Sequence, residues 1–211
     1  MTDRQDRKTI LSIAYGGLLV LCLLLGTKVI SLGPLATDGS QIPYALLLAI
    51  VAIVTEVEGG RAARRLIYAG LAFQAFAFAL IWLTLLLPFS DDADPARVAA
   101  FDILVGQNPR MILAGAVSYL ITTTVIRKMQ VALSRSRTIP LGRRSLISNV
   151  TGQALDTVVY LGIAFYAIHP LTPLMAGQFI TKTLIAVAIV PVVVRLGTEW
   201  LSGSGEITER I

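Results

Sequence analysis

Four polar side chains share one face of a predicted helix inside an apolar stretch of the sequence. They are Asn149, Gln153, Asp156 and Tyr160, and their spacing of i, i+4, i+7 and i+11 places them on the same side of an α-helix. The segment continues into an apolar run at 158–165, so we expect it to lie in or beside a membrane. An ionisable residue at that depth is unfavourable and usually marks a pathway or a ligand site. The stripe therefore indicates a membrane protein that handles a polar ligand.

A lysine in the last apolar run is positioned to meet Asp156. Lys182 lies about 9 residues, or ~14 Å, into the run 173–196, and Gln178 precedes it by one turn on the same face. Asp156 lies about 11 residues, or ~16 Å, into the run 145–167. The two runs enter from opposite sides, so both side chains fall near the middle of a hydrocarbon core of roughly 30 Å. A ligand site and an ion pair that only holds two helices together are both open at this point.

Two carboxylates lie at the end of the second apolar run. Glu56 is about 14 residues, or ~21 Å, from the outer end of that run, which places it in the inner half of the membrane. We take it as a candidate for substrate contact. The alternative, a helix-end charge neutralised by Arg61, Arg64 or Arg65, is open for Glu56 and favoured for Glu58.

Two further polar features lie within apolar runs. The pair Ser118 and Thr122 on the fourth run is interpreted as a helix–helix contact, which is the commoner use of such residues in membranes. Gln74 is the single amide of the third run, and both a packing role and a site role are open for it.

The chain offers few groups for catalysis or for metal binding. It has no G-x-S-x-G, H-E-x-x-H, phosphate-binding loop or dinucleotide motif. Cys22 and His169 are the single residues of their types, so neither an intrachain disulfide nor a thiol metal site is available. We interpret His169, in a His-Pro turn, as a surface-loop residue. We predict no catalytic residue, cofactor or metal, although Glu56 and Asp156 leave a small intramembrane enzyme open.

Six apolar runs supply the elements that position these residues. The mean hydropathy is +0.74, and charged residues make up 15% of the chain, against roughly 25% in soluble domains. The first run is too long for the apolar region of a signal peptide, so we expect a retained span. We predict an all-α integral membrane protein, one domain over 1–211, with six transmembrane helices in one bundle. The spans are about 10–32, 42–58, 66–88, 111–131, 145–167 and 173–196, with a short interfacial helix at about 97–105.

The positions of the charges predict the orientation. If both termini are cytoplasmic, 14 of the 18 Lys and Arg residues fall on the cytoplasmic side, and the acidic loop 90–95 falls outside. This asymmetry is the usual topology signal of membrane proteins. Although the net charge is +5, the clustering at span ends argues against nucleic acid as a partner. We expect a multi-pass protein of the cell inner membrane, with the lipid bilayer as its surroundings.

Several segments resemble a known family. Arg144 and Ser145, followed by GQALDTVVY at 152–160, are similar to the Arg…Ser…G-Q-x-x-D-[ST]-x-x-[FY] signature of the queuosine precursor transporters, or vitamin uptake transporter family. Pro43-Tyr44 followed by EVEG at 56–59 and ARR at 63–65 resembles a second family stretch, and Arg110 and Lys182 match two more positions. Ala52 stands where the family usually has Asp, Glu58 where an aromatic is usual, and Thr123 and Ile126 where it has Gln and Asp.

The resemblance implies uptake of 7-deazaguanine precursors of queuosine, namely preQ0, preQ1 or queuine. A guanine-like base has adjacent N–H donors for a carboxylate, a carbonyl oxygen for a lysine or an amide, and a flat face for an aromatic ring. The predicted substrate-binding residues are Asp156, Gln153, Lys182, Glu56, Asn149, Tyr160, Gln178 and Tyr44. The alternatives are the substrate-binding membrane subunit of an ATPase-energised vitamin or nucleobase importer, an intramembrane enzyme, and an assembly protein. A homo-oligomer is left open.

Overall fold

The computed structural model describes residues 2–32, 35–90, 92–105, 109–135, 138–165 and 171–203. Within these ranges it contains seven α-helices and one two-stranded hairpin. The helices are α1 (Thr2–Leu25), α2 (Gln41–Val57), α3 (Gly60–Leu85), α4 (Pro95–Val105), α5 (Pro109–Ser134), α6 (Leu141–Phe165) and α7 (Leu171–Ser202), and the strands are β1 (Val29–Leu32) and β2 (Leu35–Asp38). His169 lies outside the described residues.

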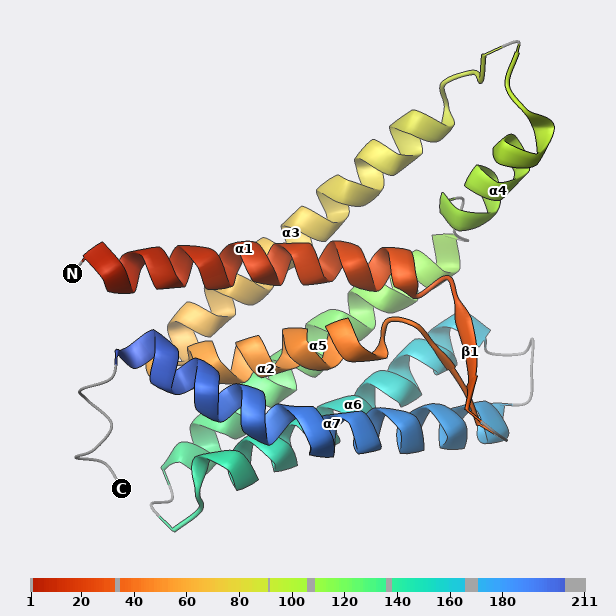
Figure 1. The fold of residues 1–211 in the computed structure, drawn as a ribbon. Helices are drawn as coiled ribbons and strands as arrows, with labels where there is room; N and C mark the ends of the chain where they lie inside the picture. Colours follow the sequence, from red (N-terminus) through yellow and green to blue (C-terminus); the bar gives the residue numbers. More distant parts are fainter. Residues whose placement is uncertain are drawn as a thin grey trace.

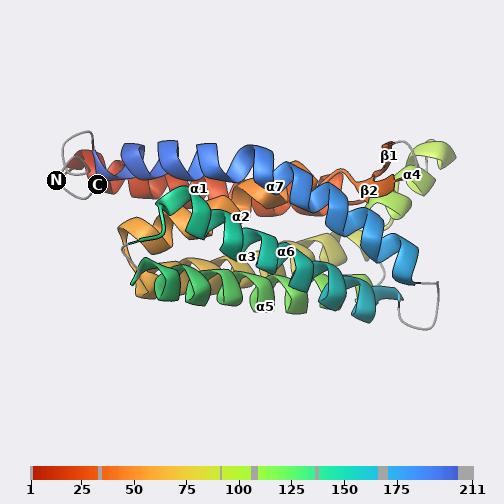
Figure 2. The same cartoon turned by 90° about the horizontal axis from the view of Figure 1, so that it is seen from below.

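The long helices place the start of α1 and the end of α7 at one end of the bundle (Figure 1). A side-chain contact joins these two elements, because Arg7 Nη1 donates a hydrogen bond of 2.6 Å to the backbone oxygen of Trp200. The hairpin and α4 lie at the opposite end, as the perpendicular view also shows (Figure 2). The two ends of the helical region therefore lie on one side, as an even number of crossings requires.

Four of the described helices are long and apolar enough to cross a membrane: Asp3–Leu25, Gly60–Leu85, Arg110–Ser134 and Met175–Ser202. Helix α2 is apolar but has only 17 residues. Helix α6 has 25 residues, and its polar first half keeps it out of this group, as the sequence indicated. The all-α fold and the multi-pass character are thus present. The count of six spans and the side on which the termini lie stay predictions.

The first predicted span is wrong at its carboxyl end. Helix α1 stops at Leu25, and the residues expected to continue it form β1, in which Val29 pairs with Asp38 of β2. β-Branched residues such as Val29 and Ile30 favour extended backbone over helix. A helix is present where a short one was predicted at 97–105, as α4 (Pro95–Val105), and its position at the membrane interface stays a prediction.

The second and third predicted spans meet at a tight turn. Helix α2 ends at Val57, and Gly59 has a φ of +85°, a left-handed conformation that glycine adopts without strain. Helix α3 begins at Gly60, six residues before the predicted start at 66, and ends at Leu85 rather than 88. The predicted start was too late because it was taken from the first residue of the apolar run. The basic residues that precede this run are also helical.

Helices α2, α5, α6 and α7 pack most extensively and form the part of the fold that matters for the polar stripe. A Cβ atom at Gly152 of α6 would lie 2.5 Å from Ile126 Cδ1 of α5, so only glycine permits this close approach. Ala52 of α2 is fully buried in an apolar cluster with Ala186 and Val190 of α7. The alanine that replaces the family's usual aspartate therefore serves helix packing here.

Candidate functional site

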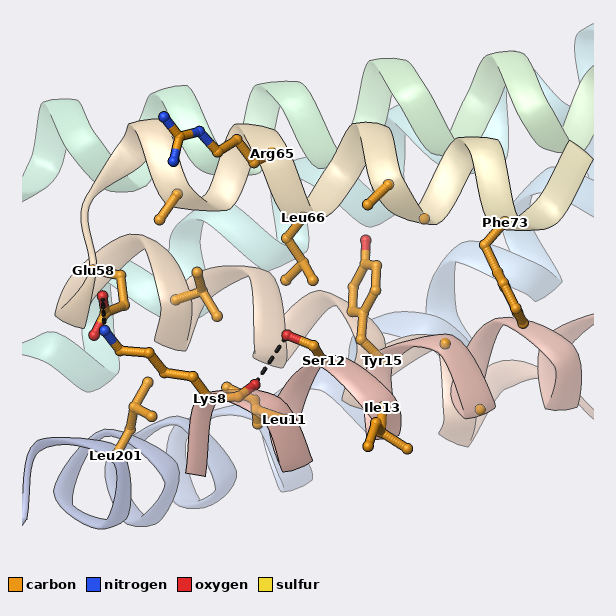
Figure 3. A pocket seen from close by; sticks show the side chains of 16 residues that line it. Lys8, Leu11, Ser12, Ile13, Tyr15, Glu58, Arg65, Leu66, Phe73 and Leu201 are labelled. Carbon is orange, nitrogen blue, oxygen red and sulfur yellow. Dashed lines mark hydrogen bonds and ion pairs between the residues drawn. The ribbon is translucent and has the colours of Figure 1, made fainter. Parts of the chain in front are cut away.

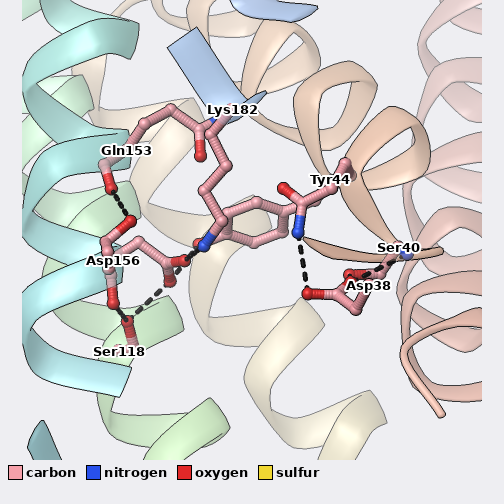
Figure 4. Close-up of polar contacts among 9 residues, drawn as sticks. Asp38, Ser40, Tyr44, Ser118, Gln153, Asp156 and Lys182 are labelled. Atoms are coloured by element: carbon pink, nitrogen blue, oxygen red, sulfur yellow. Dashed lines mark hydrogen bonds and ion pairs between the residues drawn. The ribbon is translucent and has the colours of Figure 1, made fainter. Parts of the chain in front are cut away.

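The carboxylate of Asp156 is the centre of a buried polar cluster (Figure 4). Its Oδ1 atom accepts hydrogen bonds from the Tyr44 hydroxyl, at 2.8 Å, and from the Ser118 hydroxyl, at 2.6 Å. Its Oδ2 atom accepts a charged hydrogen bond from Lys182 Nζ at 2.6 Å. Helices α2, α5, α6 and α7 each contribute one of these four side chains, so the cluster ties the centre of the bundle together.

The ion pair within this cluster is almost completely removed from the surface. The exposed fraction is 7% for Asp156 and 4% for Lys182. Desolvating two charges is offset only when additional hydrogen bonds satisfy them, and Tyr44 and Ser118 supply two. The Tyr44 ring contributes again, because Lys182 Nζ lies 5.9 Å from its centroid, within cation–π range. Two hydrogen bonds and one cation–π contact therefore stabilise the ion pair.

Three amide side chains predicted for the site carry unpaired acceptors. Gln153 Oε1, Gln178 Oε1 and Asn149 Oδ1 are buried and accept no hydrogen bond from the described part of the chain. Asn149 uses its nitrogen, which donates to the backbone oxygen of Ser145 at 2.9 Å. Gln153 precedes Asp156 by three residues on α6, and Gln178 precedes Lys182 by four on α7. Unpaired buried acceptors are rare in folded proteins, and here they flank the ion pair.

Tyr160 follows Asp156 by one helical turn on α6 and is partly buried. It makes no side-chain hydrogen bond within the described residues. The structure therefore brings together Tyr44, Asp156 and Lys182 by direct contact, with Gln153, Gln178 and Tyr160 on adjacent turns.

Glu56 does not join this cluster. It forms an ion pair with Arg144 in the first turn of α6, and Gln130 Nε2 lies 3.5 Å from its other oxygen. Arg144 precedes Asp156 by 12 residues on α6, or about 18 Å along the axis. Glu56 meets Arg144 because it is the penultimate residue of α2 and because α6 begins at Leu141, four residues before the predicted span.

A second polar network surrounds the Glu56–Arg144 pair. Gln130 of α5 donates to Ser145 Oγ at 3.1 Å and accepts from Ser148 Oγ at 3.0 Å. Gln130 and both serines are buried. Gln130 was not among the predicted site residues, since it lies beyond the most apolar part of its helix and belongs to no motif. This network joins α2, α5 and α6 near the end of the bundle where the chain termini lie.

Glu58 takes the helix-end role that was favoured for it, with different partners. Arg4 Nη2 and Lys8 Nζ of α1 lie 3.1 and 2.7 Å from its two oxygens. The predicted partners in the first turns of α3 were wrong, because the side chain of Glu58 turns toward α1.

The interpretation of Ser118 as a pure packing residue was incomplete. Its hydroxyl joins α5 to α6, as a helix contact does, but the acceptor is the central carboxylate. The signal was present in the spacing of Ser118 and Thr122 on a face that meets the polar stripe. Arg110, which matches a family position, donates from Nε to the backbone oxygen of Ile163 at 2.6 Å and joins the first turn of α5 to the last turn of α6.

The geometry is unsuited to paired-carboxylate chemistry. Tyr44, which contacts Asp156, precedes Glu56 by 12 residues on α2, or about 18 Å along that axis. The described residues contain no group of three or more His, Cys, Asp or Glu side chains that could hold a metal ion.

Comparison with known proteins gives one match. A family model described as "Putative vitamin uptake transporter" matches residues 38–196. The matched region extends from the end of β2 into α7 and includes the whole buried cluster. No curated protein and no solved structure matches the chain.

Proposed function

The chain belongs to the vitamin uptake transporter family, and on that premise we propose that it imports 7-deazaguanine precursors of queuosine. Membership of a transporter family makes a small molecule the substrate and argues against an enzyme. The candidate cargoes are preQ0, preQ1 and queuine, which share one purine-like edge. The proposed binding residues are the eight predicted from the sequence, with Ser118 added as a support of Asp156.

The observation that carries the proposal is the buried contact between Lys182 Nζ and Asp156 Oδ2. It sets two carboxylate acceptors beside one ammonium donor. The edge of a guanine-like base has a carbonyl acceptor followed by two N–H donors in a row. A base that separates the two side chains can donate both N–H groups to Asp156 and accept from Lys182. One interaction between protein side chains is thereby exchanged for three with the substrate.

The unpaired amide oxygens support selectivity for a base rich in donors. Gln153 Oε1 and Gln178 Oε1 lie one turn to either side of the ion pair and can accept further N–H groups. A base that lacks those donors leaves the buried acceptors unpaired, which is the strongest means of rejecting an analogue. Tyr160, one turn beyond Asp156, is the proposed stacking partner for the flat face.

We assign Glu56 a role in the inner part of the route. Its ion pair with Arg144 lies between the buried cluster and the end that carries the termini. Passage of a substrate toward that end requires α2 and α6 to separate there, and hence the pair to break. A carboxylate and a guanidinium exposed by that motion would also contact a departing polar base.

We further propose that α1, α2, α3, α5, α6 and α7 all cross the inner membrane, with both termini cytoplasmic. Residues 1–211 then form one transmembrane transporter domain. The basic residues at the end shared by the termini support this orientation.

Thermal unfolding of the purified protein tests the substrate assignment. A ligand that binds only the folded state raises stability by RT ln(1 + [L]/Kd), or about 2.7 kcal/mol at a ligand concentration of 100 Kd. Addition of preQ0, preQ1 or queuine is expected to raise the melting temperature, while adenine, which has a different edge, is expected to leave it unchanged. Equal shifts with adenine, or no shift with any deazaguanine, would contradict the proposal.

A further inference from the structure

A groove lined by residues of α1, α2 and α3 lies away from the Asp156 cluster (Figure 3). Its volume is about 790 Å³, within the roughly 300–1,000 Å³ typical of ligand pockets. Tyr15 of α1 points toward α3, and Phe73 of α3 points toward α1. The remaining lining is mostly apolar or small, including Leu11, Gly16 and Leu66. The groove therefore suits a flexible apolar chain.

One end of the groove carries its charged side chains. Lys8 and Arg65 line it, together with Glu58. Glu58 already faces two cations, Lys8 and Arg4. Arg65 forms no ion pair within the described residues, and the same holds for its neighbours Arg61 and Arg64. An excess of positive charge thus lies where the apolar channel begins.

The length of the groove fits one leaflet of a bilayer. It runs from Lys8 to Gly17 on α1 and from Ala62 to Phe73 on α3, distances of about 14 and about 17 Å along the helix axes. Half of a hydrocarbon core of roughly 30 Å is close to these values. Both α1 and α3 are candidate membrane spans, so the groove opens toward lipid.

We propose that this groove is a binding site for an anionic phospholipid. One acyl chain lies between α1 and α3 along Tyr15 and Phe73, and the phosphate lies at the basic end beside Arg65 and Lys8. Clustered Lys and Arg residues at the end of a span attract anionic headgroups. The lipid supplies packing between two helices that otherwise touch each other sparingly. This site is separate from the transport site and does not depend on the identity of the cargo.

Lipid-dependent thermal stability of the purified full-length chain in detergent tests the site. Phosphatidylglycerol and phosphatidylcholine with identical acyl chains are added separately, and glycerol 3-phosphate serves as a soluble source of the phosphate. Phosphatidylglycerol is expected to raise the melting temperature by several degrees more than phosphatidylcholine. Glycerol 3-phosphate is expected to have no effect, because it lacks the chain that fills the groove.

Two pairs of variants locate the effect. Arg65→Gln is expected to remove most of the difference between the two lipids, while Arg64→Gln, an exposed arginine outside the groove, is expected to retain it. A Cβ atom at Gly16 would lie 3.9 Å from Phe73 Cε1, an ordinary van der Waals distance, so Gly16→Leu places a larger side chain at the wall of the groove. It is expected to abolish the response to both lipids, and the exposed control Ala14→Leu is expected to keep it. Each shift is measured against the lipid-free melting temperature of the same variant.

Several outcomes would contradict the lipid site. One is an equal rise in melting temperature with both lipids that Gly16→Leu leaves unchanged. Others are a rise with glycerol 3-phosphate alone, and an equal loss of the difference between the lipids in Arg64→Gln and Arg65→Gln. A change in the oligomeric state of lipid-free Gly16→Leu, measured by light scattering, would show instead that a second copy of the chain occupies the groove.

Discussion

Lys182 Nζ and Asp156 Oδ2 lie 2.6 Å apart and join α7 to α6 in the buried interior of the bundle. This contact fixes the register of the two helices. Because the helices run in opposite directions, Gln153 and Gln178 lie one turn away from the ion pair on opposite sides of it. The same contact presents acceptors beside a donor. Structural support and ligand recognition are therefore properties of one pair, and experiments have to separate them.

Asp156→Asn alone is expected to destabilise the protein. Removing one partner of a buried ion pair leaves the other charge uncompensated, at a cost of roughly 3–5 kcal/mol. The double variant Asp156→Asn with Lys182→Met removes both charges and is expected to recover most of that loss. Thermal unfolding of the single and double variants measures the coupling. A double variant as unstable as the sum of the two singles would show that the pair does not hold the fold.

Tyr44→Phe and Ser118→Ala each remove one hydrogen bond to Asp156 Oδ1. A hydrogen bond to a charged group contributes about 1.5–3 kcal/mol, and we expect a loss in that range for each. The phenylalanine keeps the ring near Lys182 Nζ and so isolates the hydroxyl. Because both donors share one oxygen, the double variant should lose more than the sum. Ser134→Ala is the control, since that hydroxyl bonds only within its own helix, and an equal loss there would remove the special role of Ser118.

Glu56→Gln is expected to lower uptake at least about tenfold while leaving expression normal. The Glu56 and Arg144 side chains keep exposed fractions of 20% and 14%, so the stability cost should lie between that of a surface pair and a buried pair, at about 1–2 kcal/mol. Glu199→Gln breaks an exposed pair with Arg195 and serves as the control. Wild-type uptake by Glu56→Gln would reduce Glu56 to a helix-end charge.

Cysteine labelling tests the six spans and the orientation. In a Cys22→Ala background, Asp92→Cys and Ser134→Cys place single thiols at exposed positions near opposite ends of the bundle. A membrane-impermeant maleimide added to intact spheroplasts is expected to label position 92 and to reach position 134 only after lysis. The reverse pattern would invert the orientation, and labelling of both positions from outside would rule out six spans.

The meeting of Asp156 with Lys182 could be predicted because depth along a straight helix follows from residue number alone. The contact of Tyr44 with Asp156 agrees with the same depth reasoning, since α2 and α7 begin at the same end of the bundle. That these residues bind substrate stays a prediction. The polar first half of α6 could be recognised from its one-sided stripe, which hydropathy alone does not detect.

The partners of Glu56, Glu58 and Ser118 could not be predicted in the same way. Each depends on how a helix is rotated about its axis and on which neighbour it faces, and neither is encoded in local spacing. Arg144 lies 88 residues from Glu56 in the sequence. The hairpin was missed for another reason, since an apolar β-branched segment after α1 has the composition of a span.

The most direct test of deazaguanine transport is exchange across proteoliposomes that contain only this chain. Liposomes loaded with unlabelled preQ0, preQ1 or queuine are diluted into the same labelled compound, and accumulated label is followed over time. Liposomes with the wild-type protein should accumulate at least one of the three compounds. Liposomes with the double variant Asp156→Asn and Lys182→Met, which is expected to fold, should accumulate no more label than empty liposomes. Exchange by the double variant at the wild-type rate would contradict the assignment of Asp156 and Lys182 to the substrate site. No exchange of any of the three compounds by the wild-type protein would contradict deazaguanine transport itself.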